Sequence, residues 1–362
     1  MREERREFMK TTASAAMGFA LAKVSSVAGA QGVASDFDIQ ASFAEFMRGI
    51  GGSPQDAGGK VVFTGRDPIV RSHFRIASSM AIPAMGAGVS AAAIWRERTG
   101  EPQDLKVDLR ESMYNVNPLM TLIMGQRRLS GAVPADDAVA KNFSFVPTVN
   151  GHWYQAPLAV GNPVSFGIFG TKDNRFATIT GVYPHLLDRA LRLLKTQPDR
   201  KTIAAAIRQW DSAELDDAMA NARVIGAIHR TSEEWAQHPQ GKYLASVPLI
   251  EIVKIGASDR VPYSAKPTQP LSGIRVAALT HVIAGSCAAR TLAEYGAQVL
   301  HVARDQAFEH EGLVTDVNVG MRSTFLDLRR AADHQALSAL LPKADVFIEC
   351  FGGRSVGRLG FG

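Results

Sequence analysis

Residues 271–304, LSGIRVAALTHVIAGSCAARTLAEYGAQVLHVAR, constrain the fold most strongly because they read as strand, turn, helix and second strand in succession. The apolar run 274–279 is typical of a parallel strand buried on both faces, and 298–303 repeats that character. Between them, 287–295 has apolar residues at helical spacing and ends before Gly296, a residue type that commonly follows helices. The stretch therefore predicts a βαβ unit of a parallel sheet.

The rest of the chain extends this pattern and adds a second one. A third strand is predicted at 323–328, a helix at 331–341 and a fourth strand at 345–349. Earlier segments alternate β signals with amphipathic helices, which is typical of an α+β domain. We therefore expect an α/β protein with an open Rossmann-like parallel sheet and a second, smaller α+β domain.

Ligands of such sheets bind at the carboxyl ends of the strands. His281, Val282, Ile283 and Ala284 follow the first predicted strand, and Arg304 follows the second. The turn lacks the G-x-G-x-x-G spacing of dinucleotide-binding proteins, although a helix N-terminus still favours an anion. Arg304 is either a phosphate partner or a solvated charge at a strand end, and the spacing leaves both interpretations open.

Composition narrows the classes of function. The 362 residues have a net charge of +5, with 46% hydrophobic and 21% charged residues. The positive charge is spread along the chain, which disfavours nucleic-acid binding and leaves anionic small molecules open. No group of His, Cys, Asp and Glu has metal-ligand spacing, so we expect no metal site. We also expect no permanently bound cofactor. Cys287 and Cys350 fall near strand ends, either as reduced thiols or as a bridge.

A short motif near the end of the sequence raises one alternative activity. Gly353-Arg354-Ser355-Val356-Gly357 matches G-x-S-x-G after a predicted strand, which would make Ser355 a hydrolase nucleophile. Such a serine needs an acid and a histidine further along the chain, and five residues follow the motif. The order of residues therefore argues against a serine hydrolase.

The first 30 residues predict a targeting segment outside the fold. Arg5-Arg6 begins a twin-arginine pattern, 11–22 is moderately apolar, and Ala28-Gly29-Ala30 suits a signal peptidase. Use of this signal would send the protein to the periplasm; a frayed basic helix or a misassigned start codon is the alternative. After residue 30, we expect no stretch long and apolar enough to span a membrane.

The chain divides by composition into six segments. We expect a signal segment at 1–30, a flexible lead-in at 31–65 and a long helix with a strand of the large-domain type at 66–140. The smaller α+β domain is expected at 141–261, a proline-rich linker at 262–270 and the Rossmann-like sheet at 271–362. The long helix is predicted at 75–98. In the smaller domain, Asp173-Asn174 predicts a hairpin turn, and Asp211 or Ser212 predicts a helix cap.

Four motifs, in this order and spacing, resemble a known family. PLSGIRVAALTHVIAG, LAEYGAQVLHVAR, MRSTFLDLR and ADVFIECFGGRSVGRLGFG resemble the amino-terminal sheet of the class III CoA-transferases, the CaiB/BaiF group. The segment IASSMAIPAMGAGVSAAAIWRERTGEPQDLKVDLRESM resembles the family's long helix and the strand after it, and 172–240 resembles its smaller domain. The order suggests a fusion, in which later family elements precede the start of a second, truncated copy.

The resemblance implies that coenzyme A or an acyl-CoA binds to this sheet as a substrate. The matching positions are His281, Val282, Ile283, Ala284, Arg304, Leu326, Arg329, Phe351 and Arg358. Arginine suits this ligand because a guanidinium can grip a phosphate at two points, whereas lysine presents one charge. Ile283, Ser286 and Cys350 replace residues common in the family, which leaves the substrate open.

The resemblance also implies a reaction and its partners. In the family an aspartate attacks the acyl-CoA thioester, and CoA passes through an aspartyl-CoA thioester to a second carboxylate. That aspartate lies beyond the Leu-Gly-Phe-Gly motif, whereas this sequence ends at Gly362; Asp67 is a candidate replacement. We expect an acyl-CoA:carboxylate CoA-transferase, inactive as this fragment alone, or a catalytically inactive CoA-binding or assembly subunit. The implied partners are acyl-CoA, a small carboxylic acid and a second copy of the chain in an interlocked homodimer. The implied location is the cytoplasm, because CoA thioesters are cytoplasmic metabolites.

Overall fold

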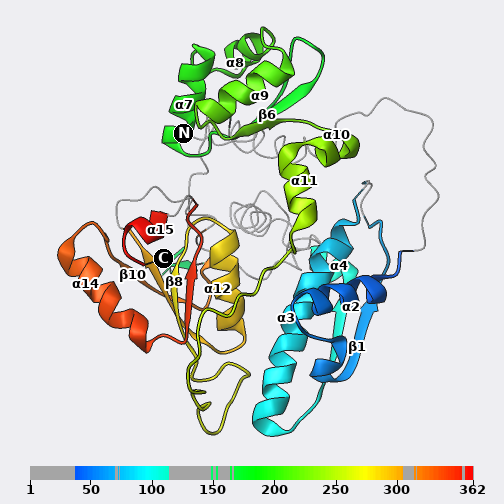
Figure 1. Cartoon of the computed structure of the whole chain (residues 1–362), viewed down its shortest axis with the longest axis vertical. Helices are drawn as coiled ribbons and strands as arrows, with labels where there is room; N and C mark the ends of the chain where they lie inside the picture. Colours follow the sequence, from blue (N-terminus) through cyan, green and yellow to red (C-terminus); the bar gives the residue numbers. More distant parts are fainter. Residues whose placement is uncertain are drawn as a thin grey trace. The chain divides into compact units, whose positions relative to one another are not determined.

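The structure is a computed structural model, and it describes residues 37–69, 72, 74–113, 148–149, 152–153, 164, 167–304, 314, 316–352 and 355–361. The chain forms two units (Figure 1). The first comprises Met1–Phe37 with Pro157–Ala236, and the second comprises Asp38–Ala156 with Gln237–Gly362. The twin-arginine segment lies outside the described residues, so its role and the segment boundaries given above stay predictions.

A four-stranded parallel sheet forms the carboxyl-terminal part of the second unit. Its strands are β8 (Arg275–Leu279), β9 (Gln298–Ala303), β10 (Arg322–Phe325) and β11 (Val346–Glu349). They pair in the order β10-β9-β8-β11, and each pair is parallel. Since β8 has a neighbour on each side, all of its residues after Arg275 are buried. The predicted α/β class with a parallel sheet is confirmed.

Helices cover both faces of this sheet, as Figure 1 shows for α12 and α14. α12 (Ala284–Glu294) packs Ala289 against Val276 on one face. On the other face, α14 (Ala331–Leu340) contributes Leu337 to a cluster with Leu279 and Val302, which α15 (Ser355–Arg358) completes. A short 3₁₀ turn, η3 (Leu341–Lys343), follows α14. The alternating side chains of each strand thus separate into two cores.

Two predicted boundaries in this sheet are displaced. α12 begins at Ala284 rather than at residue 287 because its first turn is built from small residues, of which Ser286 Oγ lies 3.1 Å from Thr280 Oγ1. The third strand is Arg322–Phe325 rather than 323–328. The chain turns directly after it, where the Arg330 N–H donates to the Asp327 carbonyl at 2.8 Å.

The amino-terminal part of the second unit is a separate layer of helices on a two-stranded parallel sheet. Its elements are α2 (Ile39–Gly49), η1 (Pro54–Ala57), β1 (Gly58–Thr64), α3 (Ile76–Thr99), β2 (Gln103–Asp108) and α4 (Leu109–Ser112). β1 pairs with β2 in parallel. A short antiparallel pair, β3 (Thr148–Val149) with β4 (His152–Trp153), follows in the sequence.

α3 corrects one expectation. It is the one helix among the described residues that has the length and composition to cross a membrane, whereas the sequence pattern predicted none after residue 30. Met85 and Val89 of this helix are fully buried in a cluster with Phe43, so α3 serves as a core helix of the unit. At its carboxyl end, Arg98 donates to the carbonyls of Pro270 at 2.7 Å and Ser272 at 3.0 Å, which fastens the linker before β8.

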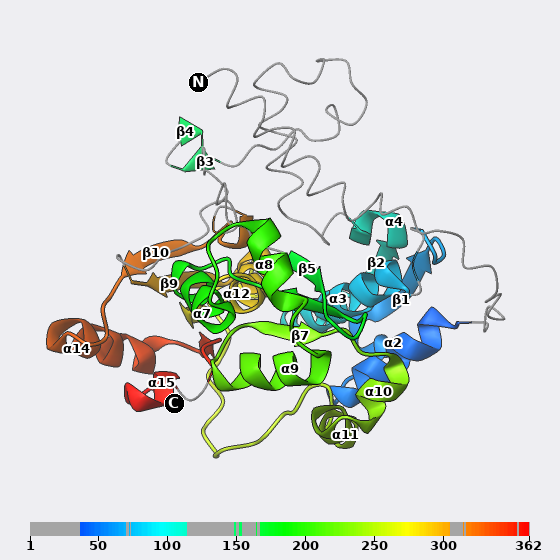
Figure 2. The same ribbon diagram turned by 90° about the horizontal axis from the view of Figure 1, so that it is seen from above.

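The first unit is a three-stranded antiparallel sheet with helices on one face. Strands β5 (Gly167–Gly170), β6 (Phe176–Ile179) and β7 (Gly226–Ile228) pair in that order. The helices are α7 (Pro184–Leu194), α8 (Arg200–Ile207) and α9 (Ser212–Asn221), all visible in Figure 2. They bury Ile203 and Leu215 against Ile179. α10 (Ser232–Gln237) and α11 (Pro239–Ser246) follow β7 in the sequence.

The turn between β5 and β6 also caps α9. Asn174 has a φ of 59°, in the left-handed region that asparagine tolerates, which confirms the predicted hairpin turn. Asp173 accepts hydrogen bonds from Ser212 Oγ at 2.6 Å and from the Ser212 N–H at 3.2 Å. Asp211 occupies the N-cap position but makes no side-chain cap bond, so the capping group comes from the hairpin instead.

Candidate functional site at the carboxyl edge of the parallel sheet

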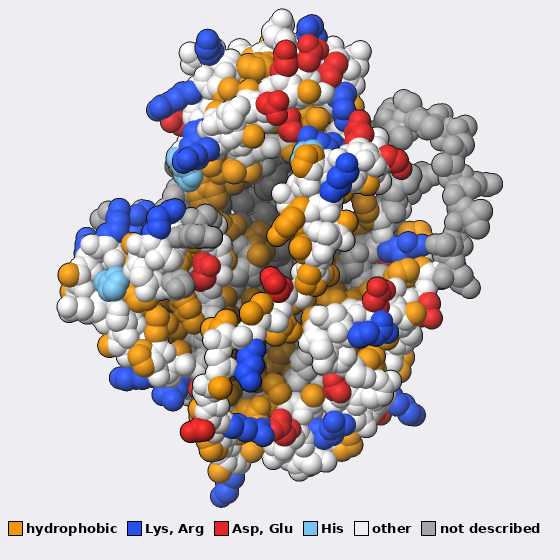
Figure 3. Space-filling model, in the orientation of Figure 1, with side chains coloured by type: hydrophobic (Ala, Val, Ile, Leu, Met, Phe, Trp, Pro, Cys, Tyr) orange, Lys and Arg blue, Asp and Glu red, His pale blue; other side chains and the backbone are white. Residues whose placement is uncertain are grey.

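Parallel pairing brings the ends of all four strands to one edge of the sheet, here called the carboxyl edge. It consists of 280–284 after β8, Arg304 after β9, 326–329 after β10, and 350–351 with α15 after β11. Every residue predicted to contact CoA lies on one of these segments. In Figure 3, Lys and Arg side chains gather over the region of α15.

The turn after β8 is closely packed and has an unusual backbone. Val282 has a φ of 62°, in the left-handed region that β-branched residues rarely adopt. A Cβ on Gly285 would lie 2.6 Å from Cys350 Cβ and 2.9 Å from its Sγ, so only glycine fits where α12 meets the end of β11. Conformations of this kind are concentrated at binding sites, where the surrounding structure holds them in place.

Two rings and a thiol line the edge between β8 and β11. The His281 N–H donates to Cys350 Sγ at 3.2 Å. The rings of His281 and Phe351 are stacked, with centroids 6.1 Å apart and planes inclined by 24°. Phe351 is 37% exposed and Ile283 is 41% exposed. These side chains therefore present a partly aromatic, apolar surface to solvent beside the N-terminus of α12.

Arg304 and Arg358 supply positive charge to the same edge. Arg304 is exposed directly after β9, and Arg358 is exposed at the end of α15. Arg358 Nη2 donates to Ser355 Oγ at 3.4 Å. Both guanidinium groups can therefore be reached by an anion from solvent.

Arg329 differs because it is held by a carboxylate in its own turn. Its Nε donates to Asp327 Oδ1 at 2.8 Å, and its Nη2 donates to Asp327 Oδ2 at 2.5 Å. The guanidinium holds the pKa of Asp327 far below its usual range, and the carboxylate raises the pKa of Arg329. The pair is thus ionised at any working pH.

Leu326 ties the turn after β10 to the core of the sheet. Its N–H donates to the Ala303 carbonyl at 2.8 Å, which continues the pairing beyond β10. Its side chain packs against the cluster that contains Val302 and Leu337. Leu326 therefore anchors the turn that carries Asp327 and Arg329 to the core.

His301 and Asp327 were not predicted as site residues. His301 is 5% exposed, and its Nε2 lies 3.0 Å from the Thr280 carbonyl, so it fixes the end of β8 from β9. Asn318 Nδ2 lies 3.5 Å from the other ring nitrogen. A histidine inside the otherwise apolar run 298–303 could have identified His301, and the acid two residues before Arg329 could have identified Asp327.

The candidate nucleophiles are occupied by structural hydrogen bonds. Asp67 Oδ2 accepts from the Ser78 N–H at 2.8 Å and from Ser78 Oγ at 2.6 Å, so it caps the first turn of α3. Ser355 Oγ donates to the Gly352 carbonyl at 2.7 Å. Cys287 and Cys350 are both free, and burial raises the pKa of the Cys287 thiol. Within the described residues, no group of His, Cys, Asp and Glu is arranged to hold a metal ion.

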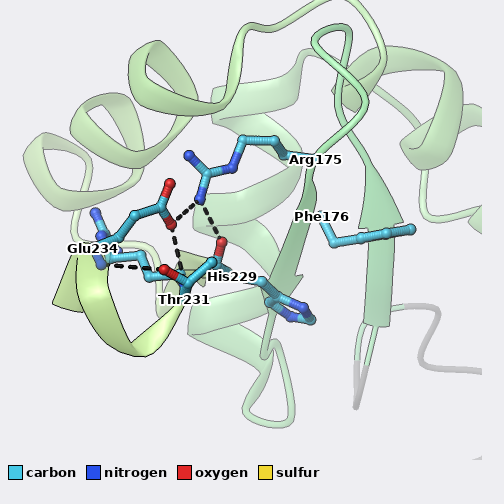
Figure 4. A pocket seen from close by; sticks show the side chains of 6 residues that line it. Arg175, Phe176, His229, Thr231 and Glu234 are labelled. Carbon is cyan, nitrogen blue, oxygen red and sulfur yellow. Dashed lines mark hydrogen bonds and ion pairs between the residues drawn. The ribbon is translucent and has the colours of Figure 1, made fainter. Parts of the chain in front are cut away.

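A hollow in the first unit is a separate polar feature, and Figure 4 shows it. Arg175 Nη2 donates to Glu234 Oε2 at 2.6 Å and to the His229 carbonyl at 2.7 Å. Glu234 Oε2 also accepts from the Thr231 N–H at 2.9 Å. Phe176 projects away from this pair and is 56% exposed. None of the residues predicted to contact CoA lines this hollow.

Comparison with known proteins assigns the sheet to a family. Residues 271–362 match the family model described as CoA-transferase family III. This segment is therefore related to the class III CoA-transferases. The matched residues contain all four strands of the parallel sheet and every segment of the carboxyl edge.

Relatives of known name extend the similarity beyond the sheet. An acetyl-coenzyme A transferase nodX from Hypoxylon pulicicidum is 26% identical over 314 residues, which cover 82% of this chain and 52% of that protein. A formyl-CoA:oxalate CoA-transferase from Bradyrhizobium diazoefficiens is 31% identical over 106 residues, which cover 26% of this chain and 25% of that protein. This chain thus spans about half the length of the first protein, and its match to the second covers a quarter of that protein.

A solved structure gives a weaker match. The crystal structure of a CAIB/BAIF family protein from Brucella suis is 17% identical, and the match covers 53% of this chain and 50% of that chain with a TM-score of 0.32. Such a score supports no argument about the arrangement of the parts. The α/β class of the chain described here follows instead from its own parallel strands and the helices that cover them.

Proposed function

We propose that this chain binds CoA or an acyl-CoA at the carboxyl edge of its parallel sheet. The observation that supports the proposal is the convergence of the predicted residues at that edge, within the segment that matches CoA-transferase family III. CoA has a phosphorylated, anionic end and an apolar, thiol-bearing arm. The edge offers both kinds of surface, with arginines near β9, β10 and α15 and the His281–Phe351 pair near β8 and β11.

The arginines would bind the phosphates. A guanidinium forms two parallel hydrogen bonds to a phosphate, and such charge-assisted bonds are about twice as strong as neutral ones. Arg304 and Arg358 are exposed, so a phosphate could reach them from solvent, and Arg329 is hydrogen-bonded to Asp327. The N-terminus of α12 would add backbone N–H groups beside the site.

The proposed reaction is transfer of CoA between carboxylic acids, as the names of the relatives suggest. In the family mechanism, an aspartate carboxylate attacks the thioester carbonyl and displaces the CoA thiolate, which leaves a mixed anhydride. The thiolate then attacks the aspartyl carbonyl, which releases the first acid and leaves an aspartyl-CoA thioester. The acceptor carboxylate attacks this thioester and displaces the CoA thiolate, which leaves a second mixed anhydride. The thiolate finally attacks the acceptor's carbonyl, which forms the new acyl-CoA and releases the aspartate carboxylate. Among the described residues, Asp67 and Asp327 do not fit the nucleophile because both carboxylates are engaged.

The proposed function also implies which molecules this protein binds and where in the cell it acts. We propose that the assembled protein is a dimer that uses an acyl-CoA and a small carboxylic acid. CoA thioesters are cytoplasmic metabolites, which favours a cytoplasmic site of action; export through Arg5-Arg6 would instead place a CoA-loaded protein in the periplasm.

Calorimetric titration of CoA into the full chain tests the proposal, with 3′-dephospho-CoA for comparison and acyl transfer assayed alongside. We expect CoA to bind, and to bind more tightly than the analogue if an arginine grips the 3′-phosphate. Binding together with transfer would support a CoA-transferase. Binding without transfer would support the alternative of a CoA-binding or assembly subunit. An absence of binding would refute both.

A further inference from the structure

We propose that Asp327 is a positioning residue, which orients Arg329 so that one edge of its guanidinium faces an incoming phosphate of CoA. The inference rests on the proposed function, because it concerns the same site. It goes further by giving a role to an acid that lies between Leu326 and Arg329 and was not predicted as a site residue.

The contact between the two residues is a two-point fork. Arg329 Nε donates to Asp327 Oδ1 at 2.8 Å, and Nη2 donates to Oδ2 at 2.5 Å. The backbone N–H of Arg329 also donates to Oδ1, at 3.2 Å. Three bonds to one carboxylate therefore fix both the turn and the plane of the guanidinium.

The backbone of Asp327 is also held in place by hydrogen bonds. The Asp327 N–H donates to Asp333 Oδ2 at 2.9 Å, and Asp333 lies in the first turn of α14. The Asp327 carbonyl accepts from the Arg330 N–H at 2.8 Å. The Asp327 side chain is 12% exposed, whereas that of Arg329 is 64% exposed. A partly buried acid with an anchored backbone thus orients a solvent-facing base.

The fork leaves the outer edge of the guanidinium available. Arginine has five N–H donors, and the side chain of Asp327 uses one on Nε and one on Nη2. The donors of Nη1 and the second donor of Nη2 remain for a phosphate. Because the side chain is ordered before the ligand arrives, binding would cost less conformational entropy.

Two effects of opposite sign make the inference testable. Asp327 orders Arg329, which favours phosphate binding, but its negative charge also opposes an anionic ligand. If orientation dominates, loss of the carboxylate weakens CoA binding. If charge dominates, the same loss strengthens it.

The experiment is a double-mutant cycle on CoA affinity, measured by calorimetric titration of the full chain. Asp327→Asn keeps the shape of the side chain and removes the charge-assisted fork. We expect it to weaken CoA binding roughly 2- to 12-fold, the range that corresponds to ordering one long side chain. In an Arg329→Ala background, and also in an Arg329→Lys background, we expect Asp327→Asn not to weaken CoA binding, because no guanidinium remains to be oriented and only the repulsion between the Asp327 charge and the anion is removed.

Asp345→Asn is the matched control. Asp345 Oδ2 accepts the Arg275 N–H at 2.8 Å, so this change also removes one negative charge and one backbone contact, but at the amino end of β8. We expect CoA affinity to be unchanged in this variant. Thermal unfolding of each variant checks that the sheet is intact.

Three outcomes would overturn the inference: unchanged CoA affinity in Asp327→Asn, tighter CoA binding in that variant, or a loss of equal size when Arg329 is already replaced by Ala or Lys. A failure of the unaltered chain to bind CoA would be a different result. It would overturn the proposed function, and the inference with it.

Discussion

Arg304 is either a phosphate partner or a solvated charge at a strand end, and the two interpretations predict different contributions to CoA binding. As a phosphate partner, it should contribute about 1.5–3 kcal/mol to CoA binding, the usual range for hydrogen bonds to charged groups. We therefore expect Arg304→Ala to weaken CoA binding by that amount in a calorimetric titration. As a solvated charge at the end of β9, it would contribute almost nothing.

Arg275 provides the control for this measurement. It is an exposed arginine at the amino end of β8, so Arg275→Ala changes the net charge equally at the opposite edge of the sheet. We expect Arg275→Ala to leave CoA affinity unchanged. Equal losses in the two variants would mean that only net charge matters, which would remove Arg304 from the site.

Gly285 tests the packing of α12 against β11. An added Cβ would lie 2.6 Å from Cys350 Cβ, which is closer than real Cβ contacts, so Gly285→Ala should destabilise the unit by roughly 1–3 kcal/mol. Gly88→Ala in α3 is the matched control, because the nearest atom would be 3.7 Å away. There we expect unchanged or slightly higher stability. Denaturant unfolding measures both changes, and Cys350→Gly should restore much of the loss.

A site residue could be predicted where a charged side chain directly follows a predicted strand, as Arg304 follows β9, because ligands of parallel sheets bind at the carboxyl ends of the strands. Asp327 was not predicted: its only signal is its position two residues before Arg329, and an acid near a basic residue in a turn is common on protein surfaces. The requirement for glycine at 285 was equally hidden, since it depends on Cys350, which lies 65 positions later in the sequence and meets α12 only in the folded sheet.

The hairpin between β5 and β6 predicts a pH dependence for the first unit. Hydrogen bonds from Ser212 and Thr171 lower the pKa of Asp173 from 3.8 to about 2. The folded unit therefore binds this proton less readily than the unfolded chain, and its stabilising contribution is present above pH 3.8. We expect that contribution to be lost as the pH falls from about 4 through about 2.

Thermal unfolding between pH 2 and pH 5 can isolate this contribution. Asp173→Asn should lower the unfolding temperature of the first unit at pH 5 and flatten its dependence on pH below 4. Asp188→Asn is the control, because Asp188 forms an exposed pair with Arg192 within α7. An Asp173→Asn variant with the same acid sensitivity as the unaltered chain would contradict this account.

Elements with strong periodicity were predicted well, and their ends were not. β8, α12 and β9 were expected in that order from apolar runs and helical spacing, and all three are present. The start of α12 was missed by three residues because alanine, glycine and serine in its first turn give no apolar period. The early end of β10 was missed because Leu326, which looks like a strand residue, anchors the following turn to the core.

At the level of the molecule, the sequence predicted a parallel sheet, a smaller α+β domain, and a long helix and strand of the large-domain type at 66–140. The amino-terminal elements α2 to α4 belong to the same unit as the parallel sheet, and Arg98 of α3 binds the linker that precedes β8. No sequence pattern shows that contact, because it joins a helix end to backbone carbonyls. The apolar composition of α3 is explained by this core position.

The location of bound CoA tests the central claim most directly. We propose hydrogen–deuterium exchange of the full chain with and without saturating CoA. The account predicts slower exchange at 280–287, 326–330 and 355–358, with no change at 226–236 around the hollow of the first unit. Binding of CoA that slows exchange only outside the carboxyl edge would contradict the account.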